Sequence, residues 1–145
     1  MPLLVGLTPA LAQNELKGLT GLNVGVVLDE AVQKQHPDLQ QAIQRDVEIK
    51  LRTAGMEILS AADLMSKPRV TISISTTSTG AGFLLMFAFA EPAFLERDKT
   101  RRVQAATWVR EGIAFTVNET ESRGLIKGMA DESINAWLIA NPRTR

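Results

Sequence analysis

The sequence predicts an α+β fold, a two-layer sandwich in which two helices cover one face of a mixed sheet of about five strands. Two segments with helical spacing of apolar residues lie toward opposite ends of the chain, and strand-like segments with short connections lie mainly between them. The chain has 145 residues, 45% of them hydrophobic and 22% charged, which suits one domain with a core. We therefore expect a single domain over residues 22–142 with the element order β-α-β-β-β-β-α.

The first strand is expected at Leu22–Asp29, a short and mostly apolar run. It ends in the acidic pair Asp29 and Glu30, whose side chains should point to opposite faces and so do not form a ready acid–base pair. The polar stretch 31–38 that follows is typical of a loop. It contains the only histidine, His36, which should be extended because it precedes a proline.

The first helix is predicted at Leu39–Ala54, where most apolar residues recur every three or four positions and form one broad face. Asp38 is a suitable N-cap, and Gly55 can supply a left-handed C-cap. Ile43 and Val47 lie on the apolar face and should be buried against the sheet.

The central strands follow the first helix. The segment 56–59 is expected as a short strand, and Val70–Thr77 alternates strictly, which is typical of a strand with one buried and one wet face. The loop 78–82 contains two glycines and suits a hairpin. It leads into Phe83–Ala90, which is apolar on both faces. Pro92 then weakens the ladder and marks an edge, a bulge or a strand end.

The last third of the chain supplies one more strand and the second helix. The charged residues 96–102 are expected to form a turn, and Val103–Val109 alternates again before Gly112 bends the strand. Asn118 is the expected N-cap of a helix that Asn141-Pro142 stops. Its apolar stripe is predicted to contain Leu125, Ile126, Met129, Ala130, Ile134, Trp137 and Leu138, with Leu125, Met129 and Trp137 buried.

The amino terminus resembles the end of a secretory signal peptide. Residues 1–12 carry no charged side chain and end in Ala10-Leu11-Ala12, which places small residues at the positions that signal peptidase requires. A basic amino-terminal region is missing, so a hydrophobic first strand or a disordered tail is the alternative. A flexible lead-in over residues 13–21 would follow. We therefore expect a periplasmic or secreted protein, and no segment approaches the roughly 20 apolar residues of a transmembrane helix.

The composition argues against several classes of function. The 16 lysines and arginines balance the 16 aspartates and glutamates, whereas nucleic-acid-binding proteins normally carry a basic excess. The chain has no cysteine, no tyrosine and one histidine, which removes thiolate nucleophiles and most multi-ligand metal sites. Neither a GxSxG elbow nor a phosphate-binding loop is present. We therefore expect a protein that is not an enzyme and that holds no cofactor.

Two groups of side chains are candidate contact sites. Alternation along the strands places an outward cluster beside the hydroxyl stripe of the 70–77 strand, a mixture that is typical of a protein-binding surface. This cluster consists of Leu84, Met86, Ala106 and Trp108. A covering loop is the alternative. The densest cations are Arg97, Lys99, Arg101 and Arg102, a candidate contact for phosphate or anionic lipid unless they form only a solvated turn.

Three stretches carry a resemblance to a known group of proteins. They are DVEIKLRTAGMEIL at 46–59, AATWVREGI at 105–113 and INAWLIANP at 134–142. In this order they resemble a group of small exported bacterial proteins of unknown function, which have a helix running into LRxAG, a central TW strand and a final helix ending in NP. The resemblance covers roughly residues 20–142 and implies no catalytic residues. The chain departs from that pattern at Arg110-Glu111, where small polar or glycine residues are expected.

The layout is also similar to that of small periplasmic α/β domains of envelope assembly, such as the amino-terminal domain of the Tol-system propeller protein. That likeness is architectural and does not fix a function. The favoured hypothesis is a non-catalytic exported domain that binds a protein partner or itself. The alternative is a carrier or sensor of a small apolar ligand, held between the helices and the aromatic strand 83–90, which would need an internal pocket of a few hundred Å³.

Overall fold

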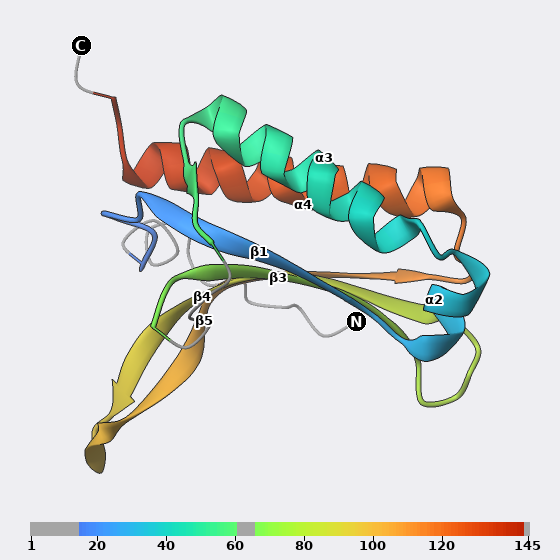
Figure 1. Cartoon of the computed structure of the whole chain (residues 1–145), viewed down its shortest axis with the longest axis horizontal. Coiled ribbons are helices and arrows are strands. Elements are labelled where there is room, and N and C mark those ends of the chain that lie inside the picture. The colour runs from blue at the N-terminus through green and yellow to red at the C-terminus, as the bar shows by residue number, and fades with distance from the viewer. Residues whose placement is uncertain (1–14, 61–65, 144–145) are drawn as a thin grey trace, which may run out of the picture.

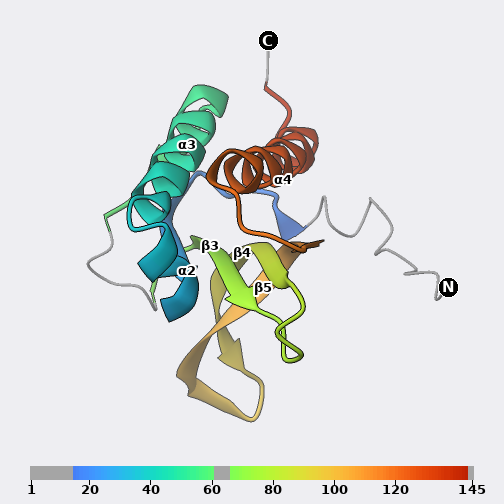
Figure 2. The same ribbon diagram turned by 90° about the vertical axis from the view of Figure 1, so that its right-hand side faces the viewer.

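The structure, a computed structural model, describes residues 15–60 and 66–143 and has the predicted α+β fold. Two long helices, α3 (Leu39–Ala54) and α4 (Glu119–Ala140), lie side by side over one face of a five-stranded mixed sheet (Figure 1). The strands are β1 (Gly21–Leu28), β2 (Glu57–Ile58), β3 (Arg69–Thr76), β4 (Phe83–Leu95) and β5 (Asp98–Ala114). In the described part of the chain no helix lies over the opposite face of the sheet (Figure 2).

The strand order in the sheet is β2-β1-β3-β4-β5. β1 runs parallel to both of its neighbours, whereas β3, β4 and β5 are connected as antiparallel neighbours. A parallel pair requires a crossover connection, which α3 provides between β1 and β2, while the antiparallel strands need only short loops. The amino-terminal strand therefore sits inside the sheet, between two strands that follow it in the chain.

The core lies between the sheet and the two long helices. On β3 the alternation is as predicted, with Val70, Ile72 and Ile74 fully buried on the helix side. β4 contributes Leu85, Phe87 and Phe89 to the same layer, and α3 contributes Leu39, Ile43, Val47 and Leu51. The predicted burial of Ile43 and Val47 is confirmed.

Helix α4 is rotated relative to the prediction. Trp137 is buried as expected, but Met129 is only partly buried and Leu125 is exposed. The buried side chains of α4 are Ser122, Ile126, Ala130, Ser133, Ile134 and Trp137. Small residues on this face let the helix lie close to the sheet. Ser133 can be buried because its hydroxyl donates to the carbonyl of Ala130 at 2.7 Å.

A third helix, α2 (Glu30–Gln35), occupies most of the stretch that was expected to be a loop. The Asp29 carboxylate caps it by accepting a hydrogen bond from the backbone N–H of Val32 at 2.9 Å. The prediction missed α2 because six residues are too few to show helical periodicity. The cap predicted at Asp38 makes no side-chain hydrogen bond, whereas Gly55 adopts the predicted left-handed conformation with φ of 100°.

The lead-in predicted to be flexible over 13–21 is packed where the structure describes it. Leu16 and Leu19 are buried in the core, and the indole N–H of Trp137 donates to the Leu19 carbonyl at 2.6 Å. The prediction was wrong for this part because its partners come from the far end of the chain. The signal segment predicted at 1–12 lies outside the described residues.

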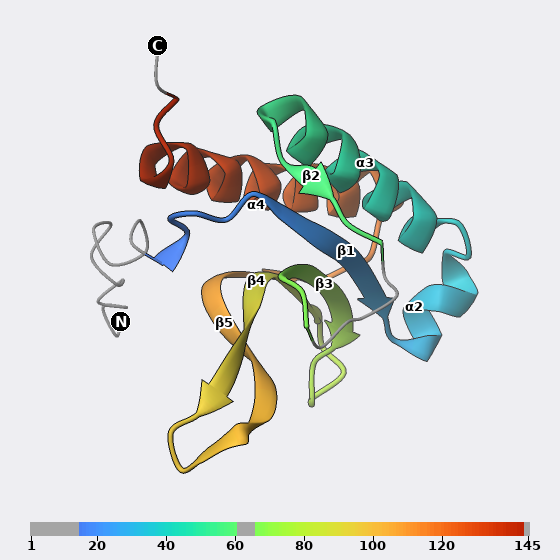
Figure 3. The same cartoon turned by 60° about the vertical axis from the view of Figure 1, so that its left-hand side comes forward.

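Strands β4 and β5 extend beyond the sheet as a two-stranded arm, residues 91–105, which curves away from the helices (Figures 1 and 3). β3 pairs with β4 only as far as Ala90, so the arm has no third strand. Pro92 lies in this region opposite Gln104. Because the β3–β4 ladder has already ended at Ala90, the missing N–H of Pro92 does not interrupt it. The turn predicted at 96–102 is shorter than expected, because β5 already begins at Asp98.

A β-bulge in β5 reverses the predicted alternation. Phe89 pairs with Trp108, but the next residue of β4 pairs with Ala106, which leaves Thr107 as an extra residue. Trp108 consequently faces the helices and is 6% exposed, while Val109 is 38% exposed. The predicted outward orientation of Trp108 is wrong because alternation was continued through the bulge.

Candidate interaction surface

The face of the sheet opposite the helices is here called the outer face. Strand register places its side chains in rows that cross β1, β3, β4 and β5. These rows are Asn23–Arg69–Ala90–Ala106, Gly25–Thr71–Ala88–Val109, Val27–Ser73–Met86–Glu111 and Ser75–Leu84–Ile113. The outer face thus changes from a polar end beside the arm to an apolar end at the β3–β4 loop.

The apolar end contains four neighbouring aliphatic side chains, here called the apolar patch: Leu84, Met86, Val109 and Ile113. Ile113 is 69% exposed, and Leu84, its partner across the ladder, is partly buried. The hydroxyl groups of Ser73 and Ser75 border the patch on β3. An aliphatic centre with a hydroxyl border is the composition expected of a protein-binding surface.

The structure divides the outward cluster that the sequence predicted. Leu84, Met86 and Ala106 lie on the outer face, but Ala106 is at the polar end, away from the other two. Trp108 lies on the helix side, where its ring centroid is 6.0 Å from that of Phe87 and 5.9 Å from that of Phe89. The Arg110 guanidinium lies 4.9 Å from the Trp108 ring centroid. Trp108 is therefore a core residue, and Val109 takes its place in the patch.

The four cations proposed as an anion contact lie on the arm and are exposed. Arg97 is in the turn, and Lys99, Arg101 and Arg102 are in β5. The Arg102 guanidinium lies 5.4 Å from the ring centroid of Phe94, a cation–π contact. The β4–β5 ladder has a register shift here, so that Arg102 pairs with Phe94 but Lys99 and Arg101 have no partner across the ladder.

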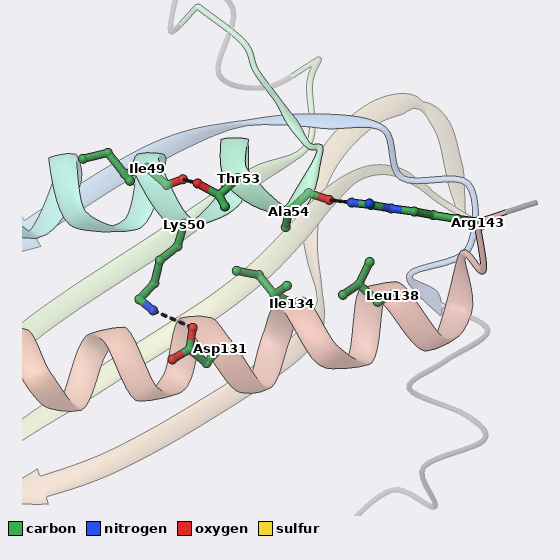
Figure 4. Close-up of a pocket in the computed structure, with 8 residues that line it drawn as sticks. All are labelled: Ile49, Lys50, Thr53, Ala54, Asp131, Ile134, Leu138 and Arg143. Atoms are coloured by element: carbon green, nitrogen blue, oxygen red, sulfur yellow. Dashed lines mark hydrogen bonds and ion pairs between the residues drawn. The ribbon is translucent and has the colours of Figure 1, made fainter. Parts of the chain in front are cut away.

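A shallow groove of about 600 Å³ runs between α3 and α4 (Figure 4). Its apolar lining comes from Ile49, Ala54, Ile134 and Leu138. Lys50 and Asp131 form an ion pair of 2.7 Å across it, and Arg143 donates to the Ala54 carbonyl at 2.8 Å (Figure 4). This groove is lined on the surface by the two helices and does not reach the aromatic strand.

A second groove, of about 720 Å³, lies between α4 and the edge strand β5. It is open because Gly124 and Gly128 carry no side chain, and apart from the adjoining backbone of α4 no atom lies within 4 Å of the position that a Cβ would take at either one. Leu125 and Met129 supply its apolar lining, and the glutamates Glu111, Glu121 and Glu132 also line it. This concentration of carboxylates disfavours pairing of the groove with a copy of itself.

In the described part of the chain, Asp29 and His36 are engaged in structural hydrogen bonds. Among residues 15–60 and 66–143 no group of three or more His, Asp or Glu side chains could hold a metal ion. Hydrogen bonds from the Thr76 hydroxyl and from the backbone N–H groups of Val32 and Thr76 hold the pKa of Asp29 below its usual range. Asp29 is thus engaged as a structural acceptor, and His36 ends α2 through a backbone bond to Val32 of 2.9 Å.

The same described ranges contain no helix that is both long enough and apolar enough to cross a bilayer. Comparison of the sequence with protein-family models and with curated proteins gave no match. The resemblance to small exported bacterial proteins therefore stays a prediction.

Proposed function

We propose that this chain is a non-catalytic binding domain that uses the apolar patch to hold a protein partner or a second copy of itself. The observation that carries the proposal is the position of Ile113. It is 69% exposed and is joined by strand register to Leu84, Met86 and Val109 on a face that the helices leave open. Apolar surface held in water costs roughly 25 cal/mol per Å², and association would recover that free energy.

The surroundings of the patch also support a protein partner. In the three rows of the outer face beyond the Asn23–Arg69 row, Glu111 is the one charged residue, and it pairs with Met86 across the ladder. Ser73 and Ser75 offer hydroxyl groups along the opposite border. Interfaces between proteins commonly have such an apolar centre with polar groups around it.

A carrier of a small apolar ligand is supported less well. The space proposed for such a ligand lies between the helices and β4, and there Phe87, Phe89 and Trp108 pack against one another with ring centroids about 6 Å apart. Close packing of this kind leaves the aromatic strand as part of the core.

We further propose that binding takes place after export, as part of envelope assembly. The support comes from the signal-like residues 1–12 and from the resemblance described above. Intact mass spectrometry of the periplasmic or secreted fraction should find a chain that begins at Gln13. A cytoplasmic protein that retains residues 2–12 would contradict this part of the proposal.

The binding proposal is tested by two matched substitutions of exposed isoleucines. Ile113→Ser changes the patch, and Ile139→Ser changes a 59% exposed position on α4. Both variants should keep the thermal stability of the parent within about 0.5 kcal/mol, because neither residue is in the core. Sedimentation velocity and co-purification should show weaker association for Ile113→Ser alone. Equal association of all three proteins would refute a role for the patch.

A further inference from the structure

The polar end of the outer face contains buried polar groups without partners. Asn23 is 2% exposed, yet neither its amide nitrogen nor its amide oxygen has a hydrogen-bond partner. Arg69 stands beside it across the β1–β3 ladder, and its buried Nε–H is also unpartnered. Within the described residues the Arg69 guanidinium takes part in no ion pair.

Such groups are costly for the folded state. A buried donor or acceptor left unsatisfied destabilises the folded state, and more so when it is charged. Native proteins satisfy nearly all such groups, so a cluster of three unpartnered atoms from two neighbouring residues requires an explanation. One explanation is a ligand that supplies the missing hydrogen-bond partners. Because Asn23 and Arg69 are neighbours across the ladder, such a ligand must present groups that match both side chains.

The backbone around Arg69 is built to make room for its guanidinium. A Cβ placed on Gly25 would lie 2.9 Å from a terminal nitrogen of Arg69, closer than side chains tolerate. The guanidinium therefore lies over Gly25. The other outer-face neighbours are also small, with Thr71 and Ala90 at adjacent ladder positions. Arg69 as a residue is only partly buried, whereas its Nε and the two side-chain polar atoms of Asn23 are themselves buried.

The unpartnered atoms define the chemistry of the ligand. The Arg69 Nε–H and the Asn23 amide nitrogen are donors that lack an acceptor, and a guanidinium selects a carboxylate in preference to a neutral oxygen. The Asn23 amide oxygen is an acceptor and requires an N–H. We propose that Asn23 and Arg69 form a binding site for a carboxylate that carries an adjacent N–H, the group found at the carboxyl terminus of a peptide and in an N-acylated amino acid.

This site is independent of the apolar patch, which lies at the other end of the outer face. It can be tested with small probes and the full chain labelled with ¹⁵N. N-acetylglycine contains both required groups, N-acetylglycinamide lacks the carboxylate, and acetate lacks the N–H. Titration with N-acetylglycine should give saturable shifts of the Asn23 side-chain amide and the Arg69 Nε–H resonances, with weaker effects from acetate. Equal shifts from N-acetylglycinamide would overturn the proposal.

Three variants make the test specific. Arg69→Gln should weaken N-acetylglycine binding about tenfold or more, the range expected for loss of a charged hydrogen bond. Gly25→Ala should act in the same direction by displacing the guanidinium, and it keeps the proposal testable if Arg69→Gln fails to fold. Arg101→Gln, on the arm, is the matched control and should bind like the parent. Unchanged binding by both site variants would refute the assignment.

A longer probe identifies the source of the ligand. N-acetyl-trialanine presents the same terminal group with more backbone. Tighter binding than that of N-acetylglycine would support the site as one for peptide carboxyl termini, and equal affinity would support it as one for small N-acylated amino acids. No saturable shift at Asn23 or Arg69 with either probe would overturn both assignments.

Discussion

Truncation of Trp108 tests the position of the β-bulge most directly. Because Trp108 is 6% exposed, Trp108→Ala removes nearly the whole indole from the core. Large aromatic-to-alanine changes in cores cost about 3–5 kcal/mol, and Trp108 also loses its contacts with Phe87 and Phe89 at 6.0 and 5.9 Å. We expect a loss of about 4 kcal/mol, a large part of the 5–15 kcal/mol typical of a domain.

The matched control is the next residue along the strand. Val109→Ala changes a side chain on the outer face and should cost about 0.5 kcal/mol or less, as surface substitutions usually do. In urea, with a slope of about 2 kcal/mol per M, the unfolding midpoint should fall by roughly 2 M for Trp108→Ala and by at most a few tenths for Val109→Ala. Far-UV circular dichroism is the appropriate readout, since one variant lacks a fluorophore. Equal shifts, or a larger shift for Val109→Ala, would refute the bulge and the apolar patch together.

Further variants test other parts of the fold. Asp46 accepts bonds of 2.8 and 3.0 Å from Arg123, which, with the charge of that guanidinium, hold its pKa below the usual value. The stabilisation that comes from this lowered pKa is complete above the unfolded pKa near 4 and is lost as the pH falls through the lower folded value. In urea titrations Asp46→Asn should therefore be less stable than the parent at pH 7, and the two proteins should converge in stability toward pH 2. In thermal melts Gly55→Ala should lose about 1 kcal/mol of stability because its φ is 100°. Gly124→Ala, in an open position inside α4, should gain up to about 1 kcal/mol, and the opposite order of the two variants would contradict the end of α3 at Gly55. Trp137→Phe should lose about 1–3 kcal/mol by chemical denaturation, because it leaves a buried carbonyl of the lead-in unpaired, and no loss would mean that water replaces the indole there.

The sequence predicts those features that depend on neighbours in the chain. Strict alternation over Val70–Thr77 correctly separates core from outer face, and the glycine after the first helix correctly marks its end. The bulge at Thr107 has no local signal. Neither orientation of β5 places only apolar side chains on the helix side. If Trp108 faces the helices, Arg110 does so too, and if Val109 faced them, Glu111 would accompany it. Only the position of α4 resolves this, since Arg110 can reach Glu132 at 2.8 Å from the sheet edge.

The sequence predicts only part of the outer face, namely some residues of the apolar patch and none of the polar cluster of Asn23 and Arg69. Leu84 and Met86 could be assigned to an outward face from the phase of β4, and the structure places them there. The polar cluster could not be found in this way, because Asn23 and Arg69 are 46 positions apart and become neighbours only through a parallel pairing. Local patterns also gave no reason to expect an unpartnered amide at Asn23.

The hydrogen bond between the Trp137 indole and the Leu19 carbonyl joins residues 118 positions apart. In the same region the side-chain amide of Asn141 donates to the Leu16 carbonyl at 2.9 Å. During synthesis on a ribosome the first of these segments emerges long before the second, so this part of the core cannot close until α4 has emerged. The nascent chain should expose Leu16 and Leu19 until α4 has emerged. A pulse-proteolysis time course on ribosome-bound chains of increasing length should therefore find the native cleavage pattern only once α4 has emerged. Such late closure would keep the polypeptide open for a chaperone, or for a translocation channel that accepts only unfolded substrates.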